Sequence, residues 1–324
     1  MKLQTFKIKD GVTLNYLKTD KFKTTNLSFF INRPLTEEEV TINALLSLVL
    51  KRSCPMYKTS MELNNALNDL YGAVIDTGIK KKGANQFIVT SFSFVNEKFI
   101  PGKPPIIDEI FAIAKDLLLS QSGFNDEYVS QEKENLKSLI LSQKNDKRLY
   151  AQARCIEEMC KGEPTGIMRY GYVDKVDGIT NEQLFTHYKN TVLKSGVDVF
   201  ICGDVDIDKV LSLVNEMYKE FNIKFRDYID LAVKTEVSEV KDITETEEIA
   251  QGKLSIGFRT GLTSKDRQYP ALMMYNAILG SGIFSKLFNN VREKLSLCYY
   301  ASSSVDSISG TMYINSGIEV ANFK

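Results

Sequence analysis

LSFFI, at residues Leu27–Ile31, is a strand-like stretch that returns in the last third of the chain as LSIGF, at Leu254–Phe258. In each copy a Leu-Thr pair begins eight residues after the first leucine, at Leu35 and at Leu262. Runs rich in aromatic and β-branched residues favour strands. Two such runs with matching surroundings at a constant offset indicate an internal duplication, which predicts a fold built from two related halves.

The elements after each strand follow the same order in both copies. The pair at Ala44–Leu45 matches the pair at Ala271–Leu272 with the same offset as the two strands. Apolar residues at helical spacing predict a first helix, a second helix follows, and alternating residues then predict strands. The predicted ranges are Val40–Lys51, Ser60–Leu70 and Phe87–Phe94 in the first copy, and Tyr269–Leu279, Ser285–Lys294 and Gly310–Asn315 in the second. We therefore expect an α+β fold with duplicated halves, each an antiparallel-rich sheet with helices packed on one face.

Only the first copy continues beyond this point. Its further patterns are an apolar helix at Ile106–Leu117, a charged helix at Asn125–Cys160 that weakens at 144–147, a buried strand at Val197–Cys202, and helices capped by Thr180 and Asp206. Residues 225–250 are charged and lack periodicity, as is typical of a linker. We expect residues 1–228 to form a full first domain and residues 229–324 an incomplete second domain. The second domain is either shortened by truncation, which we favour, or naturally small.

The composition is that of a globular protein and argues against two classes of partner. Charged residues make up 25% and hydrophobic residues 43% of the chain, and 41 Lys and Arg residues balance 41 Asp and Glu residues. A chain without a basic excess lacks the electrostatic footprint of a nucleic-acid-binding protein. The apolar stretch Ala44–Leu50 is too short to span a membrane, and Met1–Lys7 lacks the apolar core of a signal peptide. Five cysteines without CxxC spacing indicate reduced thiols and a cytoplasmic location.

Several strings along the chain resemble one family of enzymes. They are Phe124–Glu134, Gly162–Pro164, Gly203–Asp206, Gly280–Phe288 and Val291–Tyr299. With the order of the elements, they resemble the pitrilysin/insulinase-type zinc metallopeptidases, whose metal is held by an inverted H-x-x-E-H motif. The resemblance covers almost all of the chain and is most specific in the last two strings. It implies that the duplicated halves are peptidase-like domains and that the chain is a bacterial member of that family.

The metal-binding residues of that family are missing from this chain. In H-x-x-E-H, helical spacing puts two imidazoles on one face, and the glutamate beside the metal-bound water is the general base. The resemblance places the two imidazoles at Ala44 and Leu48 and the base at Ser47. The further glutamate ligand of the family falls at Leu139. None of these four side chains can supply the chemistry of the residue that it replaces.

The histidine count supports this interpretation independently of the alignment. Shifting the register by one residue puts Asn43 and Ser47 at the ligand positions and Leu46 at that of the base, so no imidazole is gained. The only histidine in the chain is His187. Zinc hydrolases usually hold their metal with at least two imidazoles. We therefore expect no catalytic residues and no cofactor, with zinc absent.

A few polar residues remain as candidates for other roles. We expect Glu132 and Glu134 to be solvated helix charges, since exposed carboxylates are the common case. His187 is expected to be a hydrogen-bonded or surface residue and not a catalyst. Arg292 and Tyr299 resemble a pair that, in active members of the family, projects toward the bound substrate. We interpret them as substrate-binding residues, and the alternative is that they brace a helix end against a strand.

The function predicted from these observations is that of a non-catalytic peptidase homologue. It would bind a peptide or an unfolded protein segment in the space between its halves, with the peptide added as a strand to a sheet edge. Its implied partner is a homologous active peptidase subunit, or a second copy of itself. Two alternatives remain open: a metallopeptidase with a non-standard site, and a purely structural homodimer.

Overall fold

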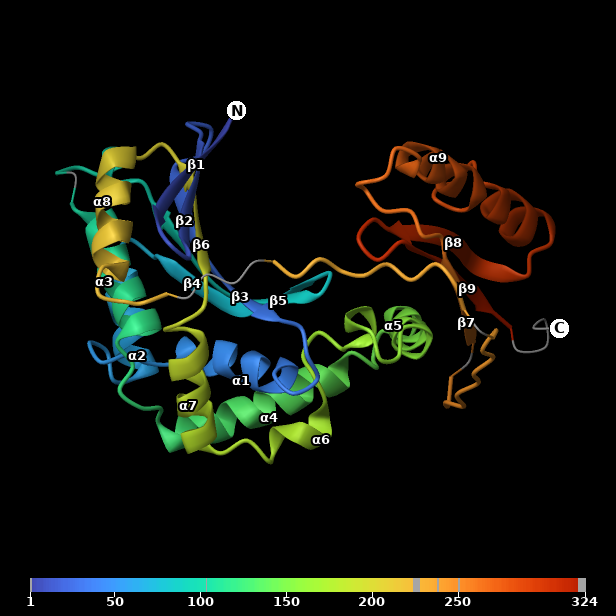
Figure 1. The fold of residues 1–324 in the computed structure, drawn as a ribbon, viewed down its shortest axis with the longest axis horizontal. Coiled ribbons are helices and arrows are strands. Elements are labelled where there is room, and N and C mark those ends of the chain that lie inside the picture. The colour runs from blue at the N-terminus through green and yellow to red at the C-terminus, as the bar shows by residue number, and fades with distance from the viewer. Residues whose placement is uncertain (1, 103, 224–227, 238, 250, 320–324) are drawn as a thin grey trace. The chain divides into compact units, whose positions relative to one another are not determined.

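The computed structural model describes residues 2–102, 104–223, 228–237, 239–249 and 251–319. The chain divides into two compact units. Unit 1 consists of Met1–Lys81, Asn85–Ile140 and Arg169–Tyr228, and unit 2 of Lys82–Ala84, Leu141–Met168 and Ile229–Lys324. Both units combine sheets with helices, which confirms the predicted α+β class (Figure 1).

Unit 1 is built on a six-stranded sheet with the order β1-β2-β6-β3-β5-β4. Its strands are β1 (Leu3–Lys9), β2 (Val12–Lys18), β3 (Thr24–Pro34), β4 (Val74–Lys82), β5 (Asn85–Val95) and β6 (Val197–Gly203). Strand β3 lies between β5 and β6 and pairs antiparallel with both. The pair of β2 with β6 is parallel, so the sheet is antiparallel-rich but mixed. Strands β1 and β4 are its two edges.

The helices of unit 1 bury one face of this sheet. They are α1 (Val40–Leu50), α2 (Ser60–Asp69), α3 (Ile106–Leu119), α4 (Asp126–Ser142), α6 (Val173–Val176), α7 (Asn181–Thr191) and α8 (Ile207–Tyr218), with a short 3-10 turn at Glu97–Phe99. Phe29 of β3 is fully buried and makes edge-to-face contacts with Phe92 of β5 and Phe111 of α3. The predicted Thr180 and Asp206 caps are both present, and Gln183 completes a capping box with Thr180.

Unit 2 has a smaller, wholly antiparallel sheet with the order β7-β9-β8. Its elements are β7 (Gly252–Arg259), β8 (Cys298–Asp306), β9 (Thr311–Ile318), helices α5 (Lys147–Met159) and α9 (Tyr269–Leu279), a π-helix at Leu287–Lys294 and a 3-10 turn at Pro164–Gly166. The predicted helix at Tyr269–Leu279 is present with the same bounds. The helix predicted at Ser285–Lys294 is a π-helix, a rare form with wider turns.

The charged helical stretch predicted at Asn125–Cys160 is two helices, α4 and α5, with the break where the pattern weakens. Asp146 begins α5 by accepting hydrogen bonds from the backbone amides of Arg148 and Leu149. Helix α5 packs against β7, so Leu141–Met168 belongs to unit 2, although the sequence-based ranges assign it to the first domain. Local pattern shows where a helix breaks but not which sheet the next helix packs against.

Among the residues that the structure describes, no helix combines the length and apolar character needed to cross a bilayer. The five cysteines are all free thiols, as expected from their spacing.

Candidate functional site

The positions that match the lost metal site lie within the helical core of unit 1. Ala44 and Ser47 are buried on α1, and Leu48 packs against the hydrophobic core. The hydroxyl of Ser47 donates a hydrogen bond to the carbonyl oxygen of Ala44 at 2.8 Å, within its own helix. These side chains fill the interior with methyl and methylene groups and offer no metal ligand.

Leu139 lies on α4, seven residues after Glu132, and is half-buried. The expectation that Glu132 is solvated is wrong, because its exposed fraction is only 3%. Its Oε1 atom accepts a hydrogen bond from Nη1 of Arg52 at 2.7 Å, and its Oε2 atom accepts one from Asn135 at 3.1 Å. The Arg52 charge allows this carboxylate to be buried. Glu134 is exposed, as expected.

The described residues bring no three His, Cys, Asp or Glu side chains together in a group that could hold a metal ion. Glu132 is committed to Arg52. The residues present therefore do not fit the zinc site that the fold suggests.

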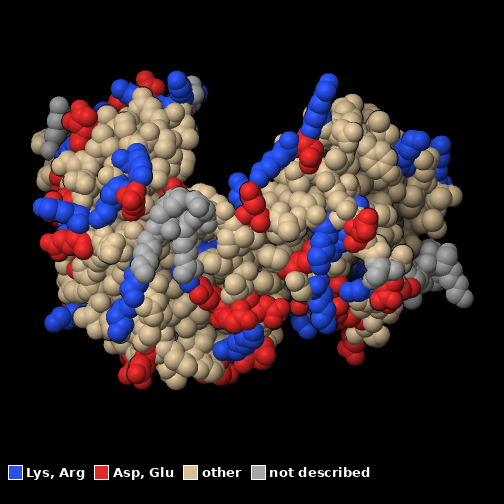
Figure 2. Space-filling model, viewed as in Figure 1, with Lys and Arg blue, Asp and Glu red and all other residues tan. Residues whose placement is uncertain are grey.

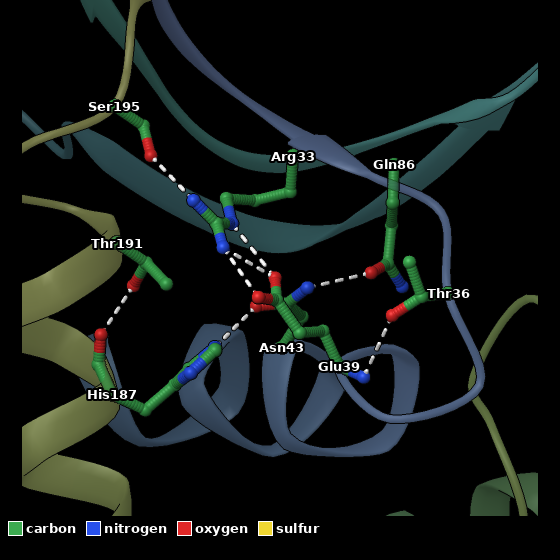
Figure 3. Close-up of polar contacts among 8 residues, drawn as sticks. All are labelled: Arg33, Thr36, Glu39, Asn43, Gln86, His187, Thr191 and Ser195. Atoms are coloured by element: carbon green, nitrogen blue, oxygen red, sulfur yellow. Dashed lines mark hydrogen bonds and ion pairs between the residues drawn. The ribbon is translucent and has the colours of Figure 1, made fainter. Parts of the chain in front are cut away.

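A polar cluster occupies the interior of unit 1 beside α1 (Figure 3). It consists of Arg33, Glu39, Asn43, Gln86, His187 and Ser195. Arg33, on β3, donates from Nε to Oε2 of Glu39 at 2.8 Å and from Nη2 to the same oxygen at 2.6 Å. Its Nη1 atom donates to the hydroxyl of Ser195 at 3.0 Å. The buried guanidinium thus has a charged partner and a neutral one, which offsets the cost of removing it from water.

The second part of the polar cluster is a chain of hydrogen bonds through Asn43. The amide nitrogen of Asn43 donates to Oε1 of Gln86 at 2.8 Å, and both side chains are fully buried. The amide nitrogen of Gln86 donates to the carbonyl oxygens of Val40 and Arg169. Oδ1 of Asn43 lies 2.6 Å from Nε2 of His187. Since this oxygen can only accept, Nε2 of His187 carries a proton and donates it.

Burial of the His187 ring lowers the pKa of the imidazole from 6.5 to about 4. The Glu39 carboxylate opposes this shift, and the nearby Arg33 guanidinium adds to it. His187 is therefore neutral at pH 7, with its proton on Nε2. A neutral imidazole that donates to Asn43 holds α7 against α1 without burying a charge.

The arrangement of the polar cluster favours a structural role over a catalytic one. Ser195 accepts from Arg33 while His187 donates to Asn43, so the hydroxyl and the imidazole have different partners. A nucleophile would need its base within hydrogen-bond reach. The sequence predicted a hydrogen-bonded or surface His187, but it did not indicate Arg33, Glu39, Gln86 or Ser195 as members of the cluster. Polar residues such as Asn43 and Gln86 inside apolar helix and strand patterns are the signal that could have found the cluster.

The two candidate substrate residues lie in unit 2, on the π-helix and on β8. The Arg292 guanidinium lies over the ring of Phe288, 4.5 Å from its centroid, and its Nε is 3.6 Å from Oε1 of Glu293. Tyr299 is exposed. Neither side chain is buried in a contact that braces a helix end. Their relationship to the unit 1 positions stays a prediction.

Comparisons with known proteins agree with the resemblance seen in the sequence. Residues 178–324 match the model of a family described as the peptidase M16 inactive domain. A Bacillus subtilis protein described as a probable inactive metalloprotease, YmfF, is 37% identical over 318 residues, which cover 97% of this chain and 74% of that protein.

Two solved structures are similar to the chain throughout its length. A conserved protein from Enterococcus faecalis matches with a TM-score of 0.88 at 29% identity, covering 98% of this chain and 75% of the other. A peptidase M16 inactive domain from Pseudomonas fluorescens matches with a TM-score of 0.74 at 16% identity and the same two coverages. The second of these supports the fold alone.

Proposed function

The chain belongs to the peptidase M16 family as an inactive homologue, and we propose that it binds extended peptides and acts beside a homologous, active peptidase subunit. The observation that carries this proposal is the state of α1, where Ala44, Ser47 and Leu48 replace the metal-binding residues while the surrounding fold is intact. A protein of this kind cannot activate water with a metal at that position. It can still bind a peptide, because strand pairing uses main-chain groups.

The edge strand β4 is the surface of unit 1 that suits such a peptide best. It pairs with β5 on one side and forms the edge of the sheet on the other. The side chains of Tyr71 and Val74 are exposed at its beginning, where they offer apolar contacts. Lys80, near its end, is exposed and positively charged and favours peptides that carry an acidic residue there.

The proposed active partner would supply the metal chemistry that this chain lacks. The fold is retained although the ligand positions, Ala44, Leu48 and Leu139, are apolar, and this supports such a partner. Arg292 and Tyr299 are accessible donors that could contact a peptide carbonyl or the partner's site without a metal.

Hydrogen exchange of the full chain tests the peptide-binding part of this proposal. The probe is reduced, carboxymethylated lysozyme, a permanently unfolded chain. We expect it to bind and to slow exchange at the amides of β4. Successive N–H groups of an edge strand point alternately toward the neighbouring strand and away from the sheet. Proline has no N–H, so one of the two substitutions Ile75→Pro and Asp76→Pro removes a donor that a bound peptide would need.

The variant of this pair that keeps its native circular dichroism should lose binding of the probe. Gln4→Pro in β1, the other edge of the same sheet, is the matched control and should leave binding unchanged. Absence of binding, or protection confined to elements other than β4, would contradict the proposal.

A further inference from the structure

Residues 239–249, which we call the strap, form an exposed segment of unit 2 without helix or strand. Its apolar side chains do not hold it in place, because Val240, Ile243 and Ile249 have exposed fractions of 95%, 50% and 36%. No hydrogen bond between backbone groups joins the strap to another element of the described chain. The position of the strap therefore depends on side chains that carry charge or donate hydrogen bonds.

Two ion pairs join the strap to helix α5. Glu247 pairs with Lys147 at 2.8 Å, and this contact lowers the pKa of the Glu247 carboxyl. Oε1 of Glu245 accepts a hydrogen bond from Nε of Arg154 at 2.7 Å and lies 2.6 Å from its Nη2. Figure 2 shows basic and acidic side chains intermingled on the part of the surface where α5 and the strap lie.

The strap contacts one stripe of α5 and runs antiparallel to the helix. Nζ of Lys241 donates to the carbonyl oxygen of Glu158 at 3.1 Å, and the Tyr150 hydroxyl lies 3.4 Å from Oε2 of Glu245. The partners on α5 stand three or four positions apart and so share one side of the helix: Lys147, Tyr150, Arg154 and Glu158. An extended chain from residue 241 to residue 247 spans about 20 Å, and the helix rises about 16 Å from residue 147 to residue 158. The strap is therefore extended along this stripe.

Detaching the strap leaves no buried charge without a partner. The side chains of both ion pairs are partly exposed, with fractions between 26% and 39%. Ion pairs in such positions contribute little each, and salt screens them. Without Glu245, Arg154 still pairs with Glu157 and Glu158 of its own helix. The free-energy cost of detaching the strap is therefore small.

The residues that precede the strap are held differently. Leu231 and Val233 are half-buried, and a Cβ added at Gly310 would meet Val233 at 2.8 Å. Lys234 adds an ion pair with Glu163, whose side chain has an exposed fraction of only 11%. Apolar contacts are not weakened by salt in the way that exposed ion pairs are. The part of the connection that salt can loosen is thus the strap itself.

We propose that the strap is a salt-sensitive clamp. At low ionic strength its ion pairs fasten it along α5, and at high ionic strength it detaches while unit 2 stays folded. Detachment uncovers the stripe of α5 and turns residues 239–249 into free length in the connection between Tyr228 and β7. The clamp acts within unit 2 and does not depend on peptide binding at β4.

A single indole placed under the strap tests this proposal. The chain contains no tryptophan, so Tyr150→Trp introduces the only indole. Acrylamide, an uncharged quencher, should reach this indole poorly while the strap is fastened. Raising NaCl from about 0.1 M to about 1 M shortens the Debye length from about 10 Å to about 3 Å, and quenching should rise about twofold or more. Leu149→Trp, at an exposed position next to the stripe, is the control and should be quenched equally at both salt concentrations.

Charge variants separate screening from other effects of salt. In the Tyr150→Trp background, Glu245→Gln with Glu247→Gln should raise quenching at low salt to the level seen at high salt. Asp242→Asn with Glu248→Gln is the matched control. It removes the same charge from two exposed strap residues that form no ion pair with the described residues of α5, so quenching at low salt should stay low.

The unsubstituted chain gives an independent measurement that does not rely on the folding of any variant. A glutamate-specific protease should cut after Glu245 or Glu247 about fivefold faster at high salt than at low salt, because the ion pairs no longer hold the strap against α5. A synthetic peptide of residues 239–249 corrects for the effect of salt on the protease itself.

Three results would overturn the proposal. Strong quenching already at low salt would show that the strap is not fastened. Quenching and cleavage that depend neither on salt nor on Glu245 and Glu247 would show that something other than charge holds it. Quenching that rises only together with a loss of circular dichroism would show that detachment requires unit 2 to unfold.

Discussion

The Nε2 atom of His187 donates to the Oδ1 atom of Asn43 across 2.6 Å (Figure 3). This bond joins α7 to α1, the helix on which the family places its catalytic motif. Asn43, next to the apolar Ala44, is a buried amide whose hydrogen bonds are made to other residues of the protein. The interior that would hold a metal in an active relative is thus held together by hydrogen bonds and apolar packing.

Replacing Asn43 by leucine should destabilise unit 1 strongly. The change leaves Oε1 of Gln86 and Nε2 of His187 without the hydrogen-bond partner that Asn43 gives them, at a cost of about 2–4 kcal/mol in the free energy of unfolding. Urea denaturation followed by circular dichroism measures this cost. Asn190→Leu, on the exposed side of α7, is the control and should change stability by less than about 0.5 kcal/mol. Equal effects of the two substitutions would show that the hydrogen-bond chain contributes little.

Stability should fall as the pH is lowered from 6.5 to 4, in part because of His187. The folded protein holds the pKa of this imidazole at about 4, whereas its ordinary value is 6.5. Between these values the unfolded chain binds a proton that the folded chain does not, so stability is fully present above pH 6.5 and is lost toward pH 4. The contribution is at most about 3 kcal/mol.

The variant His187→Gln keeps a donor for Asn43 and does not titrate, so its stability should depend less on pH over this interval. Denaturant midpoints at pH 4.5, 5.5 and 7.0 measure the difference between the variant and the unsubstituted chain. Parallel pH profiles for the two proteins would argue against a lowered pKa at His187.

Neutralising Glu39 alone should lower the free energy of unfolding more than removing both charges of its ion pair with Arg33. In Glu39→Gln the buried Arg33 loses its counter-charge, which should cost about 3 kcal/mol. The double change Arg33→Met with Glu39→Leu removes both charges and should be less destabilising than Glu39→Gln alone. Thermal unfolding of the single and double variants measures this order, with the exposed Glu37→Gln as control. The opposite order would mean that the charges contribute net stability.

The purified chain should contain no stoichiometric zinc. Ala44, Ser47, Leu48 and Leu139 offer no imidazole or carboxylate, and these are the types of side chain that hold zinc in the active members of the family. Elemental analysis of protein prepared without added metal tests this, and a chelator should leave the unfolding midpoint unchanged. One zinc ion per chain would support the alternative of a metallopeptidase with a non-standard site.

Arg292→Ala combined with Tyr299→Phe should leave the fold intact, because both side chains are accessible. If the pair contacts a peptide or the partner's site, the double variant should reduce peptide turnover by an active homologous subunit mixed with this chain. The control is Lys294→Ala, on the same π-helix. Unchanged turnover would show that Arg292 and Tyr299 contact neither the peptide nor the partner's site.

Sequence pattern predicted those features that depend on local interactions. The helix at Tyr269–Leu279, the cap at Asp206 and the break between α4 and α5 all follow from spacing, capping and composition within a few turns. The loss of the metal-binding residues could also be predicted, because the absence of histidine from the motif positions can be read from the sequence alone.

Features that depend on contacts between residues far apart in the chain could not be predicted from sequence pattern. Glu132 is buried because Arg52, eighty residues earlier, reaches it. The bond between Asn43 and His187 joins residues that are 144 positions apart. Periodicity shows which side of a helix is apolar, but it does not show which buried polar groups will meet across the core.

The chain enters unit 2 for Leu141–Met168, returns to unit 1, and leaves it again after Tyr228. The two units therefore alternate along the polypeptide, and each is built from segments that are not contiguous in sequence. A single protease cut between residues 229 and 249 would separate the backbone but leave α5, carried on the first fragment, packed against β7 on the second. The two fragments should then elute together from a sizing column until a denaturant releases them, because unit 2 is folded from pieces of both.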